Sequence, residues 1–342
     1  MQPRSSRLVT TMTFVTAVAV ALAACGSSSK GASSGSTKPT VTLSLVAYST
    51  PQTAFDAIIK EYQKTPQGAN IKFTESYGAS GDQSRAVLSG LAADVMNFSL
   101  ATDMTRLVKP NIVDTSWNTG PTKGILTNSV VVLVIRKGNP KNIRTWDDLI
   151  KPGVQVITPN PFTSGGARWN IMAAYGAQLK QGKTADEAVA YLKALFKNVP
   201  VQDDSARKAL QTFTGGKGDV LLSYENDAIF AQQKQQSIDY VIPDQTILIE
   251  SPAAVAKTSK HAAEADAFLQ YLYTPAAQRL FADNGYRPVI SGVAKPDEFK
   301  NPAVLFTIKD LGGWSDVAKK FFDPDTGIVA GIEKGIGVST SK

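Results

Sequence analysis

The sequence has few of the residues that most catalytic and metal sites need. Among 342 residues it has one cysteine, Cys25, and one histidine, His261. A single cysteine excludes an internal disulfide, and a lone histidine far from the glycine-rich turns excludes a Ser/His/Asp arrangement there. Transition-metal sites would have to use carboxylates and tyrosines. We therefore expect no catalysis, no metal and no cofactor.

A long uninterrupted hydrophobic run is also missing. The apolar segment Leu8–Ala21 is short and contains four threonines, so a permanent membrane span is not expected. Arg4 and Arg7 precede it and Leu22-Ala23-Ala24-Cys25 follows, which indicates an export signal over residues 1–25. The Leu-Ala-Ala-Cys end resembles the lipobox of bacterial lipoproteins, which implies that Cys25 is lipidated and becomes the mature N-terminus. Simple cleavage without a lipid is the alternative.

Neither charge sign predominates once the N-terminal segment is set aside. The whole chain has 36 basic and 29 acidic residues and a net charge of +7. Without the four basic residues of segment 1–40, the balance is 32 against 29, or +3. This balance gives no case for a nucleic-acid partner. Residues 26–40 are rich in Gly and Ser and predict a flexible tether, and the roughly 300 residues that follow suffice for two domains.

What the sequence does contain is a run of hydroxyl and glycine residues between a strand and a helix. Residues Asn160–Asn170 read Asn-Pro-Phe-Thr-Ser-Gly-Gly-Ala-Arg-Trp-Asn. They follow the apolar segment Val154–Ile157, which predicts a strand, and open a segment with helical spacing. Because the first N–H groups of a helix have no partner within it, Ser164, Gly165 and Gly166 predict an anion site.

Three more turns from a strand into a helix have the same form. In the first, Thr50 has the place of a helix N-cap. In the second, Ser80 and Gln83 have the spacing of a capping box. In the last, Asp203–Arg207 follows the strand-like segment Val199–Val201. Alternating strands and helices predict parallel α/β sheets, whose ligands bind beyond the carboxyl ends of the strands.

These motifs resemble the sulfate-binding proteins of bacterial ABC importers. The resemblance extends from about Val41 to Lys334 and rests on the stretches Tyr77–Ser84, Asn128–Pro140, Asn160–Asn170, Gly218–Asn226 and Gly285–Pro288. It implies an α/β fold of the two-lobed, type II periplasmic-binding-protein kind. In this fold two crossing strands join the lobes, and a hinge closes them on the anion.

The resemblance also implies where the lobes divide. Val130–Ile135 would be the first crossing strand and Tyr240–Ile249 the second. Lobe one would comprise residues 41–131 and 246–342, and lobe two residues 132–245. The segment Ala262–Phe281 has helical spacing and would cover lobe one.

Five ligand donors follow from the resemblance, position by position. Ser80 corresponds to a serine of lobe one that donates to the anion. Ser164, Gly165 and Gly166 correspond to the hydroxyl and backbone donors of lobe two, and Ala206 corresponds to a further backbone donor.

Three more positions depart from the family pattern. Tyr224 stands where relatives usually have a tryptophan whose indole N–H contacts sulfate, and its phenol can also donate. Ser49 and Thr50 replace an aspartate that contributes its backbone N–H. An insertion of one residue leaves the choice between these two open.

A site of uncharged donors suits sulfate, because all four sulfate oxygens accept hydrogen bonds. Hydrogen phosphate carries a proton that needs an acceptor. Asp82, Asp203 and Asp204 stand at helix starts, where acids complement the helix dipole; one that turned inward would make phosphate the better ligand. Arg85 and Arg168 are the nearby cations, and the resemblance implies that Arg168 braces its loop instead of binding the anion.

The sequence therefore predicts an extracytoplasmic lipoprotein that captures sulfate, or thiosulfate, for the permease subunits of an ABC importer. A binding protein for another tetrahedral oxyanion, phosphate or molybdate, is the alternative. We expect a monomer that is held at the outer face of the cytoplasmic membrane by a lipid on Cys25. Arg287, which precedes Pro288, is expected to be structural.

Overall fold

The computed structural model describes residues 39–340 of the chain. The expected export signal, Cys25 and all but the last two residues of the expected tether lie outside this range. Within it, no helix combines the length and the apolar character that crossing a bilayer requires.

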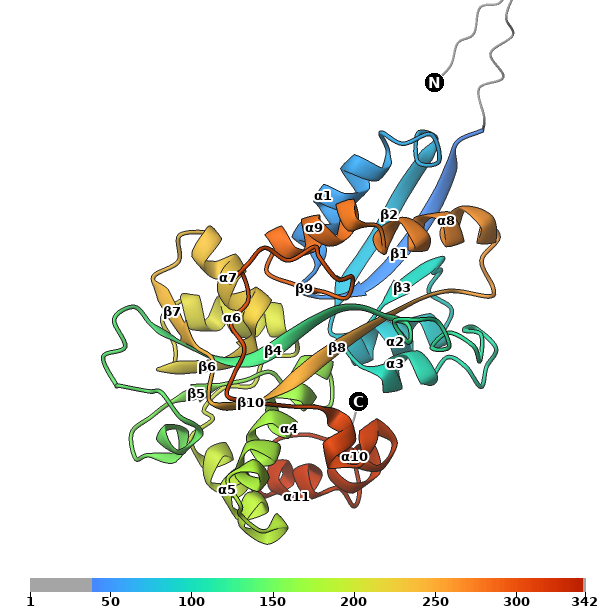
Figure 1. Ribbon diagram of the computed structural model, residues 1–342. Helices are drawn as coiled ribbons and strands as arrows, with labels where there is room; N and C mark the ends of the chain where they lie inside the picture. Colours follow the sequence, from blue (N-terminus) through green and yellow to red (C-terminus); the bar gives the residue numbers. More distant parts are fainter. Residues whose placement is uncertain (1–38, 341–342) are drawn as a thin grey trace, which may run out of the picture. The chain divides into compact units, whose positions relative to one another are not determined.

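Strands and helices alternate along most of the chain (Figure 1). The first elements are β1 (Val41–Tyr48), α1 (Gln52–Tyr62), β2 (Ile71–Gly78), α2 (Ser80–Leu88), β3 (Val95–Asn97), α3 (Ala101–Thr105) and β4 (Ile125–Arg136). The middle ones are η1 (Trp146–Ile150), β5 (Val156–Ile157), α4 (Gly165–Lys180), α5 (Ala185–Lys197), α6 (Ala206–Thr214), β6 (Val220–Tyr224), α7 (Glu225–Gln233) and β7 (Ile238–Val241). The last are β8 (Gln245–Val255), α8 (Ala262–Leu272), α9 (Pro275–Asp283), β9 (Arg287–Pro288), β10 (Val304–Phe306), η2 (Ile308–Leu311), α10 (Gly313–Phe322) and α11 (Ile328–Gly335).

The strands form a mixed sheet in the order β2-β1-β3-β8-β4-β6-β5. β1 is parallel to β2 and β3, and β5 is parallel to β6, as the alternation of strands and helices predicts. The strands that join these two groups are antiparallel, since β8 pairs in this way with β3 and β4, and β4 with β6. The predicted α/β fold is confirmed, with parallel strands in each half and antiparallel strands between them.

Two long strands, β4 and β8, connect the halves (Figure 1). β4 pairs with β8 over its first part and with β6 and β7 over its second. Its residues Val130–Val134 are fully buried, because packed elements cover both faces of the strand. The predicted first crossing, Val130–Ile135, lies within β4. The predicted second crossing, Tyr240–Ile249, is wrong in its first part, because Tyr240 belongs to the separate strand β7 and the crossing is β8.

Two other local predictions are corrected. Val199–Val201 is not a strand: Val201 makes a single bridge to Ile157. The helical segment Ala262–Phe281 is two helices, because the Thr274 hydroxyl caps a new helix start. Both helices lie beside α1, as expected for a cover over the first part of the chain.

The C-terminal helices lie against the middle of the chain. Trp314 of α10 packs edge-on against Trp169 of α4, with ring centroids 4.6 Å apart. Phe321 packs in the same way on Tyr175, at 4.8 Å. The sequence assigned all of 246–342 to lobe one, whereas α10 contacts α4 of segment 132–245 as well as α3 of segment 41–131.

Candidate functional site

Seven of the eight residues expected to bind the anion line one small cavity. The lining comes from six segments of the chain and contains hydroxyl groups, backbone amides and no charged side chain: Tyr48, Ser49, Thr50, Ser80, Ser99, Ser164, Gly166, Ala206 and Tyr224. The eighth residue, Gly165, lies against the same wall, since a Cβ on it would stand 2.2 Å from Ser99 Oγ. The structure thus brings the expected residues together, and their contacts to a ligand stay a prediction.

The N-terminus of α4 supplies one wall of the cavity. Ser164 is its N-cap and accepts the Ala167 N–H at 3.3 Å, so the Ser164 hydroxyl hydrogen is left to donate. Gly165 and Gly166 are the first two residues of the helix, and neither N–H has an acceptor among residues 39–340. Three uncharged donors therefore occur in consecutive residues.

The start of α6 supplies the second set of amides. Ala206 is the first residue of the helix, and the hydroxyl of Ser205 caps it. Arg207 N–H donates to Ser49 Oγ at 3.4 Å, and Arg207 Nη2 donates to Thr50 O at 2.8 Å. These bonds hold α6 against the turn after β1, so Ser49, Thr50 and Ala206 face the same cavity.

Two of the predicted helix caps are wrong. Thr50 does not cap α1; its Oγ1 accepts from the Tyr286 hydroxyl at 3.2 Å. α2 begins at Ser80 itself, so Ser80 and Gln83 cannot form a capping box. The first N–H groups of both helices therefore have no side-chain cap.

The Ser80 hydroxyl is engaged within the protein. Ser80 Oγ donates to Asp103 Oδ2 at 2.6 Å and accepts the Ser99 N–H at 3.0 Å. Because a hydroxyl has one hydrogen, the Ser80 side chain cannot also donate to an anion in this arrangement. The donor that Ser80 offers is its backbone N–H, in the first turn of α2.

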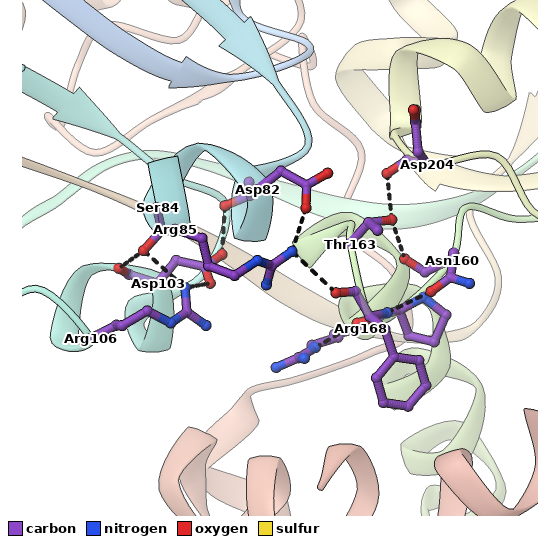
Figure 2. A network of polar contacts seen from close by, with 12 residues as sticks. Asp82, Ser84, Arg85, Asp103, Arg106, Asn160, Thr163, Arg168 and Asp204 are labelled. Carbon is purple, nitrogen blue, oxygen red and sulfur yellow. Dashed lines mark hydrogen bonds and ion pairs between the residues drawn. The ribbon is translucent and has the colours of Figure 1, made fainter. Parts of the chain in front are cut away.

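Asp103 is a buried acid that the sequence analysis did not single out. It forms an ion pair with Arg106 at 2.9 Å, and its backbone carbonyl accepts from Ser84 Oγ at 2.6 Å (Figure 2). The pairing with Arg106 balances the charge of the carboxylate, which would otherwise repel an anion one hydroxyl away.

The three acids that could have changed the ligand preference point elsewhere. Asp82 pairs with Arg85, Asp204 pairs with Lys208 at 2.5 Å, and Asp203 accepts a hydroxyl of α6 at 3.1 Å. None of the three lines the cavity. In the described part of the chain, no group of three or more His, Cys, Asp or Glu side chains is arranged to hold a metal ion.

Arg85 and Arg168 hold the loop before α4 (Figure 2). Arg168 Nε donates to Pro161 O at 2.8 Å, and its guanidinium lies over the Phe322 ring at 4.9 Å. Burial lowers the pKa of Arg168 to about 10, which leaves it charged at neutral pH. Arg85 Nη2 donates to Phe162 O at 3.5 Å. Neither arginine lines the cavity.

Two buried hydroxyls of the lining have no hydrogen-bond partner within residues 39–340. They belong to Ser99, just after β3, and Tyr224, the N-cap of α7. Burial raises the pKa of Tyr224 well above its usual value, so the phenol keeps its hydrogen at neutral pH. Burial likewise raises the pKa of the neighbouring Tyr48 to about 12.

Sequence analysis missed Tyr48, Ser99 and Asp103. Tyr48 ends β1 and Ser99 follows β3, so both stand at the carboxyl end of a strand, as the predicted residues do. β3 has only three residues, too few to show a period of two. The turn from β3 into α3 is therefore another strand-to-helix turn at this edge, and a search for hydroxyls after short apolar runs would have found it.

Comparison with known proteins gives a consistent result. A family model described as bacterial extracellular solute-binding protein matches residues 43–287. The sulfate-binding protein of Synechococcus elongatus is 42% identical over 318 residues, which cover 90% of this chain and 91% of that protein. The thiosulfate-binding protein of Pseudomonas aeruginosa is 35% identical over 281 residues, covering 78% of this chain and 84% of that protein.

A solved structure agrees with these sequence relatives. The sulfate-binding protein SubI from Mycobacterium tuberculosis H37Rv is 45% identical, with a TM-score of 0.81 over 83% of this chain and 100% of that chain. The predicted two-lobed periplasmic-binding-protein fold is thereby confirmed. The family model covers more than half of the chain, and this protein belongs to the bacterial extracellular solute-binding protein family.

Proposed function

We propose that this protein binds sulfate outside the cytoplasm and delivers it to the permease subunits of an ABC importer. The observation that carries the proposal is a cavity whose nine lining residues offer hydroxyl and amide donors and no charged side chain. The similarity to proteins named for sulfate and thiosulfate binding supports the same ligand class. The function is binding without catalysis, by a monomer.

The uncharged donors of this site are sufficient to bind a sulfate dianion without a positively charged side chain. We assign the α4 donors to Ser164 Oγ–H and to the N–H groups of Gly165 and Gly166. Ala206 contributes its N–H, and Tyr224 contributes its phenol. A hydrogen bond to a charged group contributes roughly 1.5–3 kcal/mol, and micromolar affinity needs only about 8 kcal/mol net. Donors from Ser49 or Thr50 and from the Ser80 N–H complete the set.

The lobes close on the anion about β4 and β8. Hydrogen bonds already join them beside the cavity: Arg207 Nη2 donates to Thr50 O, and Trp169 Nε1 donates to Ser99 O at 2.7 Å. Lobe one comprises residues 41–131 together with β8, α8 and α9. Lobe two comprises residues 132–245 together with α10 and α11, a change from the initial assignment that follows from their packing on α4 and α5.

Calorimetric titration of the ligand-free protein with sulfate is expected to show binding at least as tight as micromolar at low ionic strength. Phosphate at pH 8 is expected to bind at least about 100-fold more weakly, because its remaining proton finds no carboxylate acceptor in the lining. Molybdate has no such proton and serves as the test of size alone. Phosphate binding as tight as that of sulfate, or tighter, would contradict sulfate as the ligand. Equal affinities for sulfate and thiosulfate would mean that the protein binds both.

We propose further that a lipid on Cys25 holds the exported protein at the membrane. The basis is the order of charged, apolar and Leu-Ala-Ala-Cys segments at the N-terminus. A Cys25→Ser variant expressed in a bacterial host is expected to leave the membrane fraction and appear in the soluble extracytoplasmic fraction. Immunoblots of the two fractions measure this, and retention of the variant in the membrane fraction would contradict lipid attachment.

A further inference from the structure

The Ser99 hydroxyl is buried at the cavity. Ser99 is 1% exposed, and its Oγ lines the cavity without a hydrogen-bond partner in the described part of the chain. The backbone of Ser99 is fixed at both ends, because its N–H donates to Ser80 Oγ and its carbonyl accepts from Trp169 Nε1. These two bonds keep the backbone of Ser99 at the cavity.

Tyr224 lines the same cavity. Its Oη is also buried and without a partner. Burial raises the pKa of the phenol, and the nearby Ser99 hydroxyl acts in the opposite direction. Each hydroxyl has one hydrogen. If one donates to the other, one hydrogen of the pair is still left without an acceptor, so the pair always offers a donor to the cavity.

A buried donor without an acceptor costs free energy, and at the wall of a cavity a ligand oxygen can satisfy it. We propose that Ser99 Oγ–H and Tyr224 Oη–H form a donor pair that binds the oxygens of the captured oxyanion. This inference rests on the proposed function and adds Ser99 to the site. It also assigns a task to Asp103: by accepting from Ser80 Oγ, it fixes the oxygen on which the Ser99 N–H is anchored.

The test uses Ser99→Ala and Tyr224→Phe, which remove one hydroxyl each. Both are expected to weaken sulfate binding by about 10- to 100-fold in calorimetry, the effect of a lost donor to a charged group. Ser129→Ala is the matched control, because Ser129 Oγ is also buried and has no partner among the residues that the structure describes, but does not line the cavity. Its affinity is expected to stay within about twofold of the native value. Ser164→Ala is the positive control for the site.

A second readout is the melting temperature without ligand. Ser99→Ala removes an unsatisfied hydroxyl, so its melting temperature is expected to equal or exceed that of the native protein, while its stabilisation by sulfate decreases. If Ser99 only supported the fold, Ser99→Ala would lower both the melting temperature without ligand and the stabilisation by sulfate.

The outcomes separate this inference from the proposed function. Native affinity in Ser99→Ala, with weakened binding in Ser164→Ala, would overturn the role of Ser99 and leave sulfate as the ligand. If the native protein binds no sulfate, the proposed function fails and the melting temperature of the ligand-free variants decides about Ser99. A fall of several degrees in Ser99→Ala but not in Ser129→Ala would then show an internal partner and overturn the inference. An unchanged or higher value would support a hydroxyl kept for another acceptor ligand.

Discussion

A Gly165→Ala variant is expected to bind sulfate at least about 100-fold more weakly than the native protein while keeping its fold. Gly165 is the first residue of α4, and a Cβ there would stand 2.2 Å from Ser99 Oγ and 2.8 Å from Leu100 Cγ. Neither neighbour is the mobile end of a long side chain. The methyl group therefore forces the start of α4 away from the turn after β3, at a cost of about 1–3 kcal/mol.

This displacement acts on several donors at once. The N–H groups of Gly165 and Gly166 and the Ser164 hydroxyl move with the start of α4. A lost hydrogen bond to a charged group costs roughly 1.5–3 kcal/mol, and about 1.4 kcal/mol corresponds to a factor of ten in affinity. One lost donor together with the overpacking accounts for the expected 100-fold, because the clash is relieved only in an open arrangement that binds poorly.

Gly331→Ala is the matched control for Gly165→Ala. Gly331 lies within α11, where an added Cβ meets no atom within 4 Å, and alanine there is expected to be neutral or slightly stabilising. Circular dichroism and melting temperature establish that both variants fold, and calorimetry measures sulfate affinity. An affinity within about threefold of the native value in Gly165→Ala would remove the N-terminus of α4 from the site.

The parts of the site that were predictable are those set by local chemistry. The Ser164-Gly165-Gly166 turn was recognisable because its strand, cap and helix start lie within a dozen residues. The cap itself is confirmed by the bond from the Ala167 N–H to Ser164 Oγ. Ala206 was placed at a helix start for the same reason, although the strand expected before it is a single bridge.

The parts that were missed depend on contacts between distant segments. Nothing local indicates that the Ser80 hydroxyl donates to Asp103, which lies 23 residues later. The packing of α10 on α4 joins Trp314 to Trp169 across the whole second half of the chain. Hydrophobic spacing shows which side of a helix is buried but not which partner buries it, so the packing of α10 on α4 could not be read from the sequence.

Arg287, which was expected to be structural, forms a buried ion pair with Glu225. Arg287 Nε donates to Glu225 Oε2 at 2.7 Å, and Nη2 donates to Oε1 at 3.1 Å, an arrangement of two bonds between one guanidinium and one carboxylate. Glu225 is 1% exposed and begins α7 directly after Tyr224. Burial raises the pKa of Glu225, and the positive charge of Arg287 acts in the opposite direction. The pair therefore fixes the residue beside Tyr224, a proposed ligand donor.

Arg287→Met is expected to lower the free energy of unfolding by about 3–5 kcal/mol at pH 8, because it leaves a buried carboxylate without its counterion. Without Arg287 the folded-state pKa of Glu225 rises further above its unfolded value of about 4.3. The loss of unfolding free energy in Arg287→Met should therefore be large at pH values above the folded-state pKa of Glu225. It should shrink as the pH falls toward the unfolded-state pKa, since protonation removes the buried charge. Urea titrations at pH 8 and pH 5 measure it.

Two variants decide whether the buried charge is the cause. Adding Glu225→Gln to Arg287→Met removes the unpaired carboxylate and is expected to recover part of the loss at pH 8. Lys137→Met breaks an exposed pair, Lys137 Nζ to Asp239 Oδ1 at 2.7 Å with the lysine 66% exposed, and should cost less than about 1 kcal/mol. A deficit in Arg287→Met that is equal at both pH values and unaffected by Glu225→Gln would mean that Arg287 acts through its other contacts. Those are the acceptors Lys300 O at 2.6 Å and Asn301 Oδ1 at 3.3 Å and the Phe299 ring at 5.5 Å, all independent of the charge on Glu225.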